Sequence, residues 1–467
     1  MSRLARLTGP VVLVAAACVW PPVYRSAEAA PSVGLHPPLA TVPIAPAVIV
    51  GNLSCAAAGC HGGDGGKGAK GSEHATVADA DPHRQSFRVL FQERSARMVR
   101  NLGGTGPAHR DARCLSCHGA APPNAAPLPV TDSLHRTASC ENCHGAGGNY
   151  LTVHYQVGWK ELPAAAKAAY GLVPTKDLAI RTAMCAGCHV GEPGREVDHA
   201  LIAAGHPALR FELAAYQAEP VYTRHWREPP AEAAEWLVGQ VATARAAAEL
   251  LRYRAANATK RDWPELAEFA CFSCHQGLTG TPGPLRTNAP PAGRLPWGTW
   301  VYPLPLSLTA GPAWAKPPAG DGLTRLAALF RESDRPPPKD AEAAATAAVA
   351  HLDRWLADLR TRPAPSPTDL RAALAHAVRF AGDVPRTDSP SADWDRYTQG
   401  FLATAALYRA TVAADPTART PAAEATLAEI AAGLRFPSGQ DSPRMTRDRL
   451  ADRWAALTAT FPPGVRP

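Results

Sequence analysis

Beyond residue 30, the 467-residue chain has no run of roughly 18 apolar residues, the length that a membrane-spanning helix needs. Its Lys and Arg residues form no dense basic run, although the formal net charge is +7. These absences argue against a transmembrane helix in the mature chain and against nucleic acid as a partner. Charged residues make up 19% of the chain and hydrophobic residues 46%, which indicates a globular protein, and the length predicts two folded units.

Cysteine is absent after residue 274, and histidine is rare in the same part of the chain. Only His351 and His376 occur after residue 275. Both lie in segments with a helical pattern, and we interpret them as ordinary core or surface residues. We find no catalytic constellation in this part of the chain. Its expected role is docking, either onto the rest of the chain or onto a partner protein.

The amino terminus has the pattern of a targeting segment. Arg3 and Arg6 precede an apolar run from Val11 to Trp20, and Ala27-Glu28-Ala29 matches a small-residue cleavage site. We predict a signal peptide over residues 1–30, a linker over 31–50, and an exported, periplasmic protein. Cys18 is a weaker candidate for a lipid anchor, because Ala15 stands where such a motif has a larger aliphatic residue.

Ten of the eleven cysteines form five close pairs, and a histidine follows each pair directly. Four pairs have the spacing C-x-x-C-H, whereas the first pair has four intervening residues. The cysteines are Cys55, Cys60, Cys114, Cys117, Cys140, Cys143, Cys185, Cys188, Cys271 and Cys274, and the histidines are His61, His118, His144, His189 and His275. This pattern predicts five covalently attached haem c groups.

The chemistry of haem attachment explains the spacing. Two thioethers must reach two vinyl groups on one side of a porphyrin, while the next side chain turns inward as the proximal ligand of the iron. Zinc ribbons also pair cysteines closely, and an exported chain could form disulfides. Neither alternative predicts a histidine after each pair, so haem attachment is favoured.

The second axial ligand of each iron decides whether it can bind a substrate, because an iron with two protein ligands is coordinatively closed. Eleven histidines lie outside the five motifs. Six of them are our candidate distal ligands: His83, His109, His154, His199, His206 and His225. His36, His74 and His135 are weaker candidates. The count favours irons that mostly carry two histidines.

The chain is expected to be mainly α-helical, with its two units joined by a proline-rich segment. Residues 51–280 are predicted to form a pentahaem domain of low regular-structure content, packed by porphyrin, with helical stretches from His83 to Leu102 and from Pro230 to Ala256. Residues 281–320 are a proline-rich linker in which regular helix is not expected. Trp297, Trp300 and Trp314 would be costly to expose, so the linker should pack along the haem domain.

Residues 321–467 have apolar residues at three- and four-residue steps, which is typical of amphipathic helices. The pattern predicts helices over Ala341–Leu359, Pro367–Arg379, Trp394–Ala413 and Pro421–Leu434. Pro and Asp/Ser clusters separate these segments. An antiparallel bundle of four or five helices is therefore expected.

The motif region resembles the multihaem family of cytochrome c-554, and through it the haem-packing group that includes pentahaem nitrite reductases and hydroxylamine oxidoreductase. The resemblance covers roughly residues 52–276. It rests on Asp81-Pro82-His83, on Cys140-Glu141-Asn142-Cys143-His144-Gly145 with residues 149–154, and on residues 198–213 around Ala204-Gly205-His206-Pro207. The resemblance implies that His83 and His154 are distal ligands, and His206 looks similar to another.

The chain departs from the tetrahaem pattern in its fifth motif, its widened first motif and its carboxy-terminal extension. None of the five motifs has the lysine that pentahaem nitrite reductases typically carry at their catalytic haem. This argues against ammonia-forming nitrite reduction.

Three functions are compatible with these motifs. The favoured function is electron transfer between redox partner proteins, so an electron-transfer protein is favoured over a catalytic oxidoreductase. The alternative is an oxidoreductase that acts on a small nitrogen or sulfur compound at one open haem iron. The third is a haem-bearing subunit of a membrane-associated redox complex, and it rests on the carboxy-terminal helical domain.

Overall fold

The structure is a computed structural model, and it describes residues 48–63, 69–119, 137–138, 140–226, 231–271, 295–383, 394–435 and 445–461. Within these ranges the chain is helical, and extended pairing is limited to two isolated bridges, Glu192 with Arg195 and Phe269 with Trp297. The predicted mainly α fold is confirmed.

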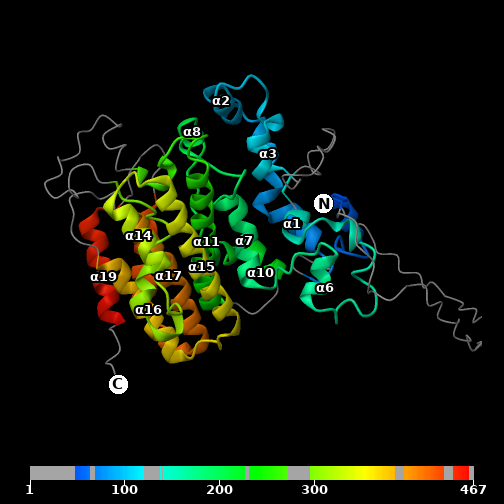
Figure 1. The fold of residues 1–467 in the computed structure, drawn as a ribbon. Coiled ribbons are helices and arrows are strands. Elements are labelled where there is room, and N and C mark those ends of the chain that lie inside the picture. Colours follow the sequence, from blue (N-terminus) through cyan, green and yellow to red (C-terminus); the bar gives the residue numbers. More distant parts are fainter. Residues whose placement is uncertain are drawn as a thin grey trace, which may run out of the picture. The chain divides into compact units, whose positions relative to one another are not determined.

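The described residues before 227 form short helices separated by turns (Figure 1). The α-helices are α1 Glu73–Ala80, α2 Glu93–Asn101, α3 Ala112–His118, α5 Cys140–His144, α6 Ala164–Ala169, α7 Leu178–His189, α8 His199–Ala203, α9 Leu213–Gln217 and α10 Pro220–Trp226. The 3-10 helices are η1 Asn52–Cys55, η2 Pro82–Gln85, η3 Arg88–Phe91, η4 Ala108–Arg110 and η5 Gly147–Asn149. These short elements place side chains around the site described below.

The helical stretch predicted from His83 to Leu102 is wrong in its continuity. It consists of η2, η3 and α2, and extended backbone at Gln92 (φ −77°, ψ 150°) separates η3 from α2. Asp81 explains why the first piece forms, because its carboxylate accepts a hydrogen bond from the backbone N–H of His83 and caps η2 (2.9 Å).

Long helices dominate the remainder of the described chain. They are α11 Glu232–Ala256, α14 Gly322–Glu332, α15 Pro338–Thr361, α16 Pro367–Gly382, α17 Trp394–Ala414, α18 Pro421–Leu434 and α19 Arg447–Thr460, with η9 Pro416–Ala418 before α18. The predicted carboxy-terminal helices are confirmed by α15 to α18, and the stretch predicted to end at Ala256 is confirmed by α11. Proline stands at the start of α15, α16 and α18, where a backbone N–H would have no helical acceptor.

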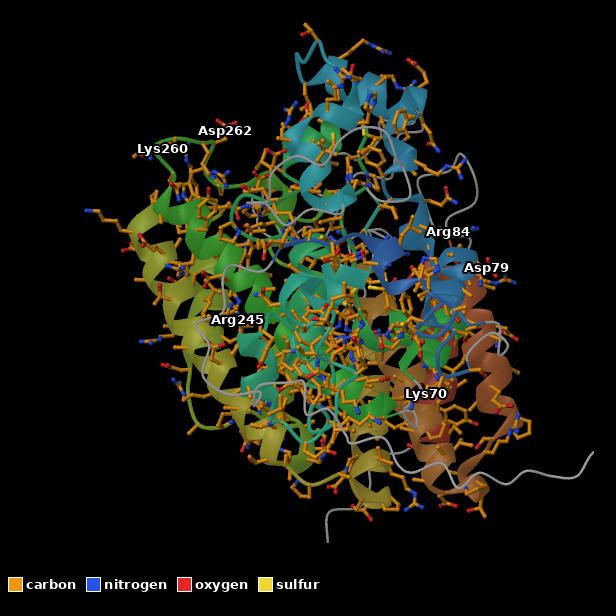
Figure 2. The ribbon with its side chains drawn as sticks, turned by 90° about the vertical axis from the view of Figure 1, so that its right-hand side faces the viewer. Lys70, Asp79, Arg84, Arg245, Lys260 and Asp262 are labelled. Carbon is orange, nitrogen blue, oxygen red and sulfur yellow. The ribbon has the colours of Figure 1, made fainter. Side chains whose placement is uncertain are left out.

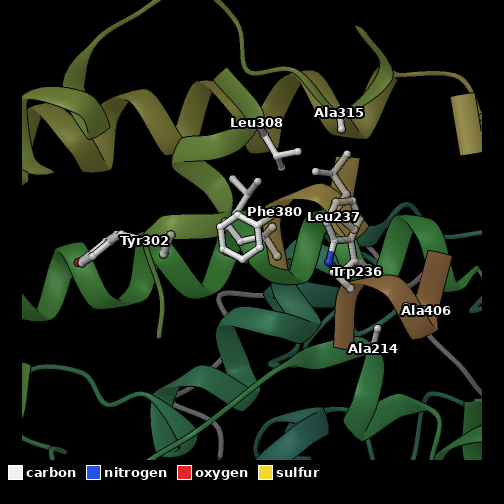
Figure 3. Close-up of a cluster of buried hydrophobic side chains, with 14 of the residues drawn as sticks. Ala214, Trp236, Leu237, Tyr302, Leu308, Ala315, Phe380 and Ala406 are labelled. Carbon is white, nitrogen blue, oxygen red and sulfur yellow. The ribbon is translucent and has the colours of Figure 1, made fainter. Parts of the chain in front are cut away.

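One buried apolar cluster extends from α7 to α19. Trp236, Trp355 and Trp454 are fully buried in it. Figure 3 shows Trp236 and Leu237 of α11 in this cluster together with Leu308 and, from α16, Phe380. Side chains of this size dominate the apolar area removed from water, so the bundle is stabilised by an ordinary hydrophobic core.

Helix α11 lies between the bundle and the motif-bearing helices (Figure 1). It packs against α15 and α17 of the bundle and also against α7 and α9. An ion pair adds to this interface, since Arg360 of α15 donates to Asp177, the residue that caps α7 (2.7 Å). The bundle is therefore attached directly to the helix that ends at His189. The boundaries at residues 280 and 320 stay a prediction.

The described part of the proline-rich segment is packed, as expected. The indole N–H of Trp300 donates to the carbonyl of Phe211 (3.0 Å), and that of Trp297 donates to Glu268 (3.0 Å). The expectation that this segment has no regular helix is wrong, because it contains α13 Pro303–Ser307, η7 Leu308–Ala310 and η8 Ala313–Ala315. Prolines 303 and 305 fit in α13 because the first turn of a helix leaves its N–H groups unpaired anyway.

His351 and His376 are ordinary packed residues of the bundle, as predicted. His351 is buried (1% exposed), and His376 Nε2 lies 3.0 Å from the hydroxyl of Ser307. In the motif-bearing part of the chain, the charged residues Lys70, Asp79 and Arg84 are exposed, and Figure 2 labels them.

Glu212 caps α9 with a carboxylate that is buried (3% exposed). Burial raises its pKa from 4.5 to about 7, although hydrogen bonds from the N–H groups of Ala215 and Ala214 oppose this shift. The unfolded chain therefore loses this proton at a lower pH than the folded chain does. Folding stability should fall as the pH rises from about 4.5 to about 7, by up to about 3 kcal/mol at roughly 1.4 kcal/mol per pKa unit.

Replacing Glu212 with glutamine should remove this pH dependence and keep the cap. Denaturation midpoints of holoprotein at pH 5 and pH 8 measure the effect. We expect the variant to be more stable than wild type at pH 8, and an equal loss with pH in both proteins would contradict the assignment.

Candidate functional site

Three of the cysteine motifs lie at the ends of helices. Helix α3 ends at His118, α5 consists of residues Cys140 to His144, and α7 ends at His189. Residues three apart lie on the same face of a helix, so both cysteines of a C-x-x-C motif face one side. Asp111 and Asp177 cap α3 and α7 through backbone N–H groups. Local helix formation therefore presents two sulfurs and one imidazole together.

The first and fifth motifs differ from this arrangement. Cys55 ends η1 and the chain then turns through Cys60 to His61, so the widened motif forms no α-helix. Cys271 of the fifth motif is half-buried, whereas Cys274 and His275 lie outside the described residues. None of the nine described cysteines forms a disulfide.

Each of the four described motif histidines faces a second histidine. The pairs are His61 with His154 (6.1 Å between ring centres), His189 with His83 (5.9 Å), His118 with His206 (6.3 Å) and His144 with His225 (6.0 Å). Two metal–nitrogen bonds of about 2 Å and two half-rings give a separation of about 6 Å between ring centres. Each pair is therefore spaced as two axial ligands of one metal ion would be.

All four pairs line a single cavity of about 1060 Å³. The eight cysteines of the first four motifs line the same cavity. A pocket for one small ligand is about 300–1,000 Å³, so this space exceeds what one such ligand needs. His74, which was a weak candidate in the sequence, lines the cavity as well.

Among the described residues before 227, one buried apolar cluster lies apart from the core of the bundle, and it consists of four residues: Phe87, Leu90, Val99 and Ala108. Other buried apolar side chains there, such as Phe211 and Leu213, belong to neither cluster. A folded chain of this size normally has a larger apolar core, so the cavity has room for a bound group. Porphyrins anchored by the cysteines would fill it. The residues present therefore fit covalently bound haem.

Hydrogen bonds orient five of these imidazoles. Nδ1 of His118 lies 2.8 Å from the carbonyl of Ser86, Nδ1 of His154 lies 2.9 Å from that of Leu151, and Nδ1 of His206 lies 2.8 Å from that of Pro207. Nδ1 of His61 lies 3.0 Å from Glu73, and Nδ1 of His83 lies 2.8 Å from Asp81. With Nδ1 donating, Nε2 keeps its lone pair for a metal, as is usual in metal-ligating histidines.

The surroundings of His144 and His189 keep these two imidazoles neutral. Burial, together with the nearby His225 and His61, lowers the pKa of His144 to about 4. Burial likewise lowers the pKa of His189 to about 4, with contributions from His83 and His118. Metal binding requires the neutral form of imidazole. These histidines are therefore in the protonation state of a ligand at neutral pH.

The thiols of different motifs lie close together. The side chains of Cys55 and Cys140 lie next to each other, and so do those of Cys117 and Cys188. The thiol of Cys143 is near enough to Cys188 for their charges to interact. The motifs are therefore adjacent in the order first, third, fourth, second. This order does not follow the chain.

The carboxylate of Glu141 links two motifs. In the sequence, Glu141 stands out only as part of the third motif. It is buried (7% exposed) and accepts hydrogen bonds from the backbone N–H groups of Val50 (2.9 Å), Gly51 (2.7 Å) and Gly147 (2.8 Å). Gly145 follows the motif with a positive φ of 80°, which favours glycine. The segment before the first motif is thereby held against the third motif.

Replacing Glu141 with alanine should lower the free energy of unfolding by about 3 kcal/mol, because three backbone donors lose a charged acceptor in a buried place. Denaturant unfolding of holoprotein measures this loss. Glu161→Ala, at an exposed position, serves as the control and should stay close to wild type. Equal stability of the two variants would contradict the role of Glu141.

Two predicted distal ligands have other surroundings. His109 stacks on Phe91 (4.3 Å between ring centres), and the backbone N–H of His199 donates to Glu265 (2.8 Å). Neither histidine is among the residues that line the cavity of about 1060 Å³. Their assignment as ligands stays a prediction. His36 and His135 lie outside the described residues.

Sequence reasoning missed Glu73 and Tyr222. Tyr222 of α10 lies 3.1 Å from Nδ1 of His83 through its hydroxyl, and its ring meets the His83 ring edge to face. No spacing rule connects these residues to the motifs, because they approach through the fold. Within the described part of the chain, no group of three or more His, Cys, Asp or Glu side chains forms a metal-binding cluster.

Paired imidazoles, cysteine motifs on helix ends and a cavity in place of an apolar core define a c-type cytochrome, a class that transfers electrons through covalently bound haem. A family model described as Cytochrome c554 and c-prime matches residues 55–145, which hold the first three motifs. Searches of curated proteins and of solved structures found no match. Proteins of this class exchange electrons with redox partners. None of the described helices is long and apolar enough to cross a membrane.

Proposed function

We propose that this protein is an exported, periplasmic pentahaem cytochrome that transfers electrons between redox partner proteins. The observation that carries the proposal is the set of four histidine pairs, each with ring centres about 6 Å apart, around one cavity. Two imidazoles on one iron leave no position for a substrate. Electron transfer is therefore favoured over chemistry on a small nitrogen or sulfur compound.

The chain's own residues hold and enclose the groups in this function. Ten cysteines would form the thioethers, and His61, His118, His144, His189 and His275 would be the proximal ligands. Haem c bound at these motifs would supply one-electron chemistry at its iron. His154, His206, His225 and His83 would close the distal positions of the first four motifs, in that order, and exclude water from them.

His199 is the proposed distal ligand of the fifth motif. Its backbone N–H donates to Glu265 (2.8 Å), and α8 packs against η6 Leu266–Glu268, which leads directly to Cys271. His199 is therefore held close to the start of the fifth motif. Asp198, which caps α8, is near enough to Arg113 of α3 for their charges to interact. The fifth motif would then lie next to the second.

Export follows from the proposal as well as from the targeting pattern of residues 1–30. Covalent attachment of haem c requires export to the compartment where this maturation occurs. The mature chain should begin after residue 30 and be recovered in the periplasmic fraction. A chain that keeps residues 1–30, or one that is acylated at Cys18, would contradict this localisation.

The test of the function combines mass and spectroscopy on purified holoprotein. Intact mass should exceed that of the polypeptide from residue 31 by five haem groups, and low-temperature electron paramagnetic resonance should show low-spin ferric signals only. A mass with four groups or fewer would contradict the pentahaem count. A high-spin signal that responds to nitrite, hydroxylamine or cyanide would overturn the carrier in favour of an oxidoreductase.

A further inference from the structure

The groups that accept hydrogen bonds from the imidazoles differ from one motif to the next. Both histidines of the second motif's pair, His118 and His206, have backbone carbonyls at Nδ1. His83, which faces His189 of the fourth motif, has the carboxylate of Asp81 instead. These two motifs are neighbours, since the side chains of Cys117 and Cys188 lie next to each other.

Asp81 is held firmly beside His83. Its side chain is 11% exposed, and Oδ1 lies 2.8 Å from Nδ1 of His83 and 2.9 Å from the backbone nitrogen of the same residue. Asp81 directly precedes η2, and α1, which leads into it, packs against α10. The carboxylate is therefore placed by the backbone on both sides and does not depend on a flexible side chain.

Tyr222 of α10 shares this carboxylate. Its hydroxyl lies 3.3 Å from Oδ1 of Asp81 and 3.1 Å from Nδ1 of His83. When Nε2 of His83 binds iron, Nδ1 carries the proton and has no lone pair to accept a second one. The hydroxyl of Tyr222 must then donate to Asp81. Oδ1 of Asp81 thus accepts from three donors: the backbone N–H of His83, Nδ1–H of His83 and the Tyr222 hydroxyl. The bond from Tyr222 weakens the bond from Nδ1 of His83.

A carboxylate at Nδ1 makes an imidazole a stronger electron donor to its metal than a carbonyl does. Stronger donation stabilises the ferric state over the ferrous state and lowers the reduction potential. The effect is larger where the carboxylate is shielded from water. Glu73 makes a similar contact with His61, but the Glu73 side chain is 22% exposed whereas that of Asp81 is 11% exposed. Asp81 is therefore the stronger case.

We propose that Asp81, with Tyr222 as a moderator, sets the reduction potential at the fourth motif below that at the neighbouring second motif. Asp81 is a positioning residue that acts through His83. This inference rests on the proposed function, because it requires His83 to be an axial ligand. It states which of two adjacent motifs has the lower reduction potential, and the histidine pairs alone do not give this order.

The test is a spectroelectrochemical measurement of the midpoint potentials of holoprotein variants. Asp81→Asn keeps an oxygen that can cap η2 but replaces a charged acceptor by a neutral one, so one midpoint potential should rise. Tyr222→Phe removes the competing donor, so the same midpoint potential should fall. Glu93→Gln removes an exposed charge from α2 and should leave every midpoint unchanged.

Opposite shifts of the midpoint potential of one haem support the proposal, because general damage to the fold would shift that midpoint potential in the same direction in both variants. Shifts of the same sign, no shift in either variant, or an equal shift at all haems would overturn it. His83→Ala separates this failure from failure of the proposed function. A low-spin spectrum that survives His83→Ala refutes His83 as a ligand, whereas a new high-spin signal with no opposite shifts refutes only the role of Asp81.

Discussion

We expect one low-spin haem to become high-spin when His154 is replaced by alanine, while the remaining haems keep their spectra. His154 faces His61 with nearly parallel rings (interplanar angle 12°) at 6.1 Å between ring centres. Its Nδ1 is engaged by the carbonyls of Tyr150 and Leu151, so Nε2 is the free ligand atom. Removing it leaves an iron with one protein ligand and a weaker ligand field.

Electron paramagnetic resonance at low temperature and the absorption spectrum of the ferric protein measure this change. Tyr155→Ala is the matched control, because Tyr155 adjoins His154 in the chain and touches its ring but is 72% exposed. The control should stay low-spin throughout. An unchanged spectrum in His154→Ala would refute this ligand, and a high-spin signal in both variants would point to disruption of the loop.

Arg254→Ala is expected to lower the free energy of unfolding by about 3–5 kcal/mol, the usual loss when one partner of a buried ion pair is removed. The Arg254 side chain is 4% exposed and donates to Glu196 (2.8 Å) and to Glu268 (2.8 Å). Both carboxylates are largely buried, and Arg261 also donates to Glu196 (2.6 Å). The alanine variant would leave the Glu268 carboxylate buried with only the Trp297 indole as donor.

Arg245→Ala on the same helix is the comparison. Arg245 pairs with Asp353 at 3.0 Å, but these side chains are 35% and 51% exposed, and Figure 2 shows Arg245 at the surface. Exposed pairs contribute up to about 1 kcal/mol, so this variant should lose far less. Thermal and denaturant unfolding of both holoproteins give the two values. Similar losses of unfolding free energy in the two variants would contradict the role of Arg254 as a partner in buried ion pairs.

The ion pairs of Arg254 with Glu196 and Glu268 also explain why the bundle and the motif-bearing part are coupled. Glu196 follows the fourth motif, Glu268 precedes the fifth, and Arg254 belongs to α11, which packs against α15. The pKa of Glu196 lies below its usual value, since the guanidinium groups of Arg261 and Arg254 outweigh the opposing effect of burial. Loss of Arg254 should therefore loosen two motifs at once.

The sequence alone identified the motifs because the chemistry of attachment is local. Two thioethers and a proximal imidazole must come from a few consecutive residues, and a helix places residues three apart on one face. The same holds for the bundle, where apolar spacing and proline at helix starts predicted α15 to α18 within a few residues. The continuity of the stretch from His83 to Leu102 was not predictable in this way, because its break at Gln92 follows no period.

The distal side was decided by the tertiary structure. His154, His206, His225 and His83 face motif histidines from which they are far apart in the chain, and nothing in their own neighbourhoods specifies a partner. The same is true of the order of the motifs in space. Spacing along the chain determines which residues one short helix can present, whereas long-range packing determines which two segments approach the same iron. The sequence therefore determined that haem is held, and only the fold decided what faces it.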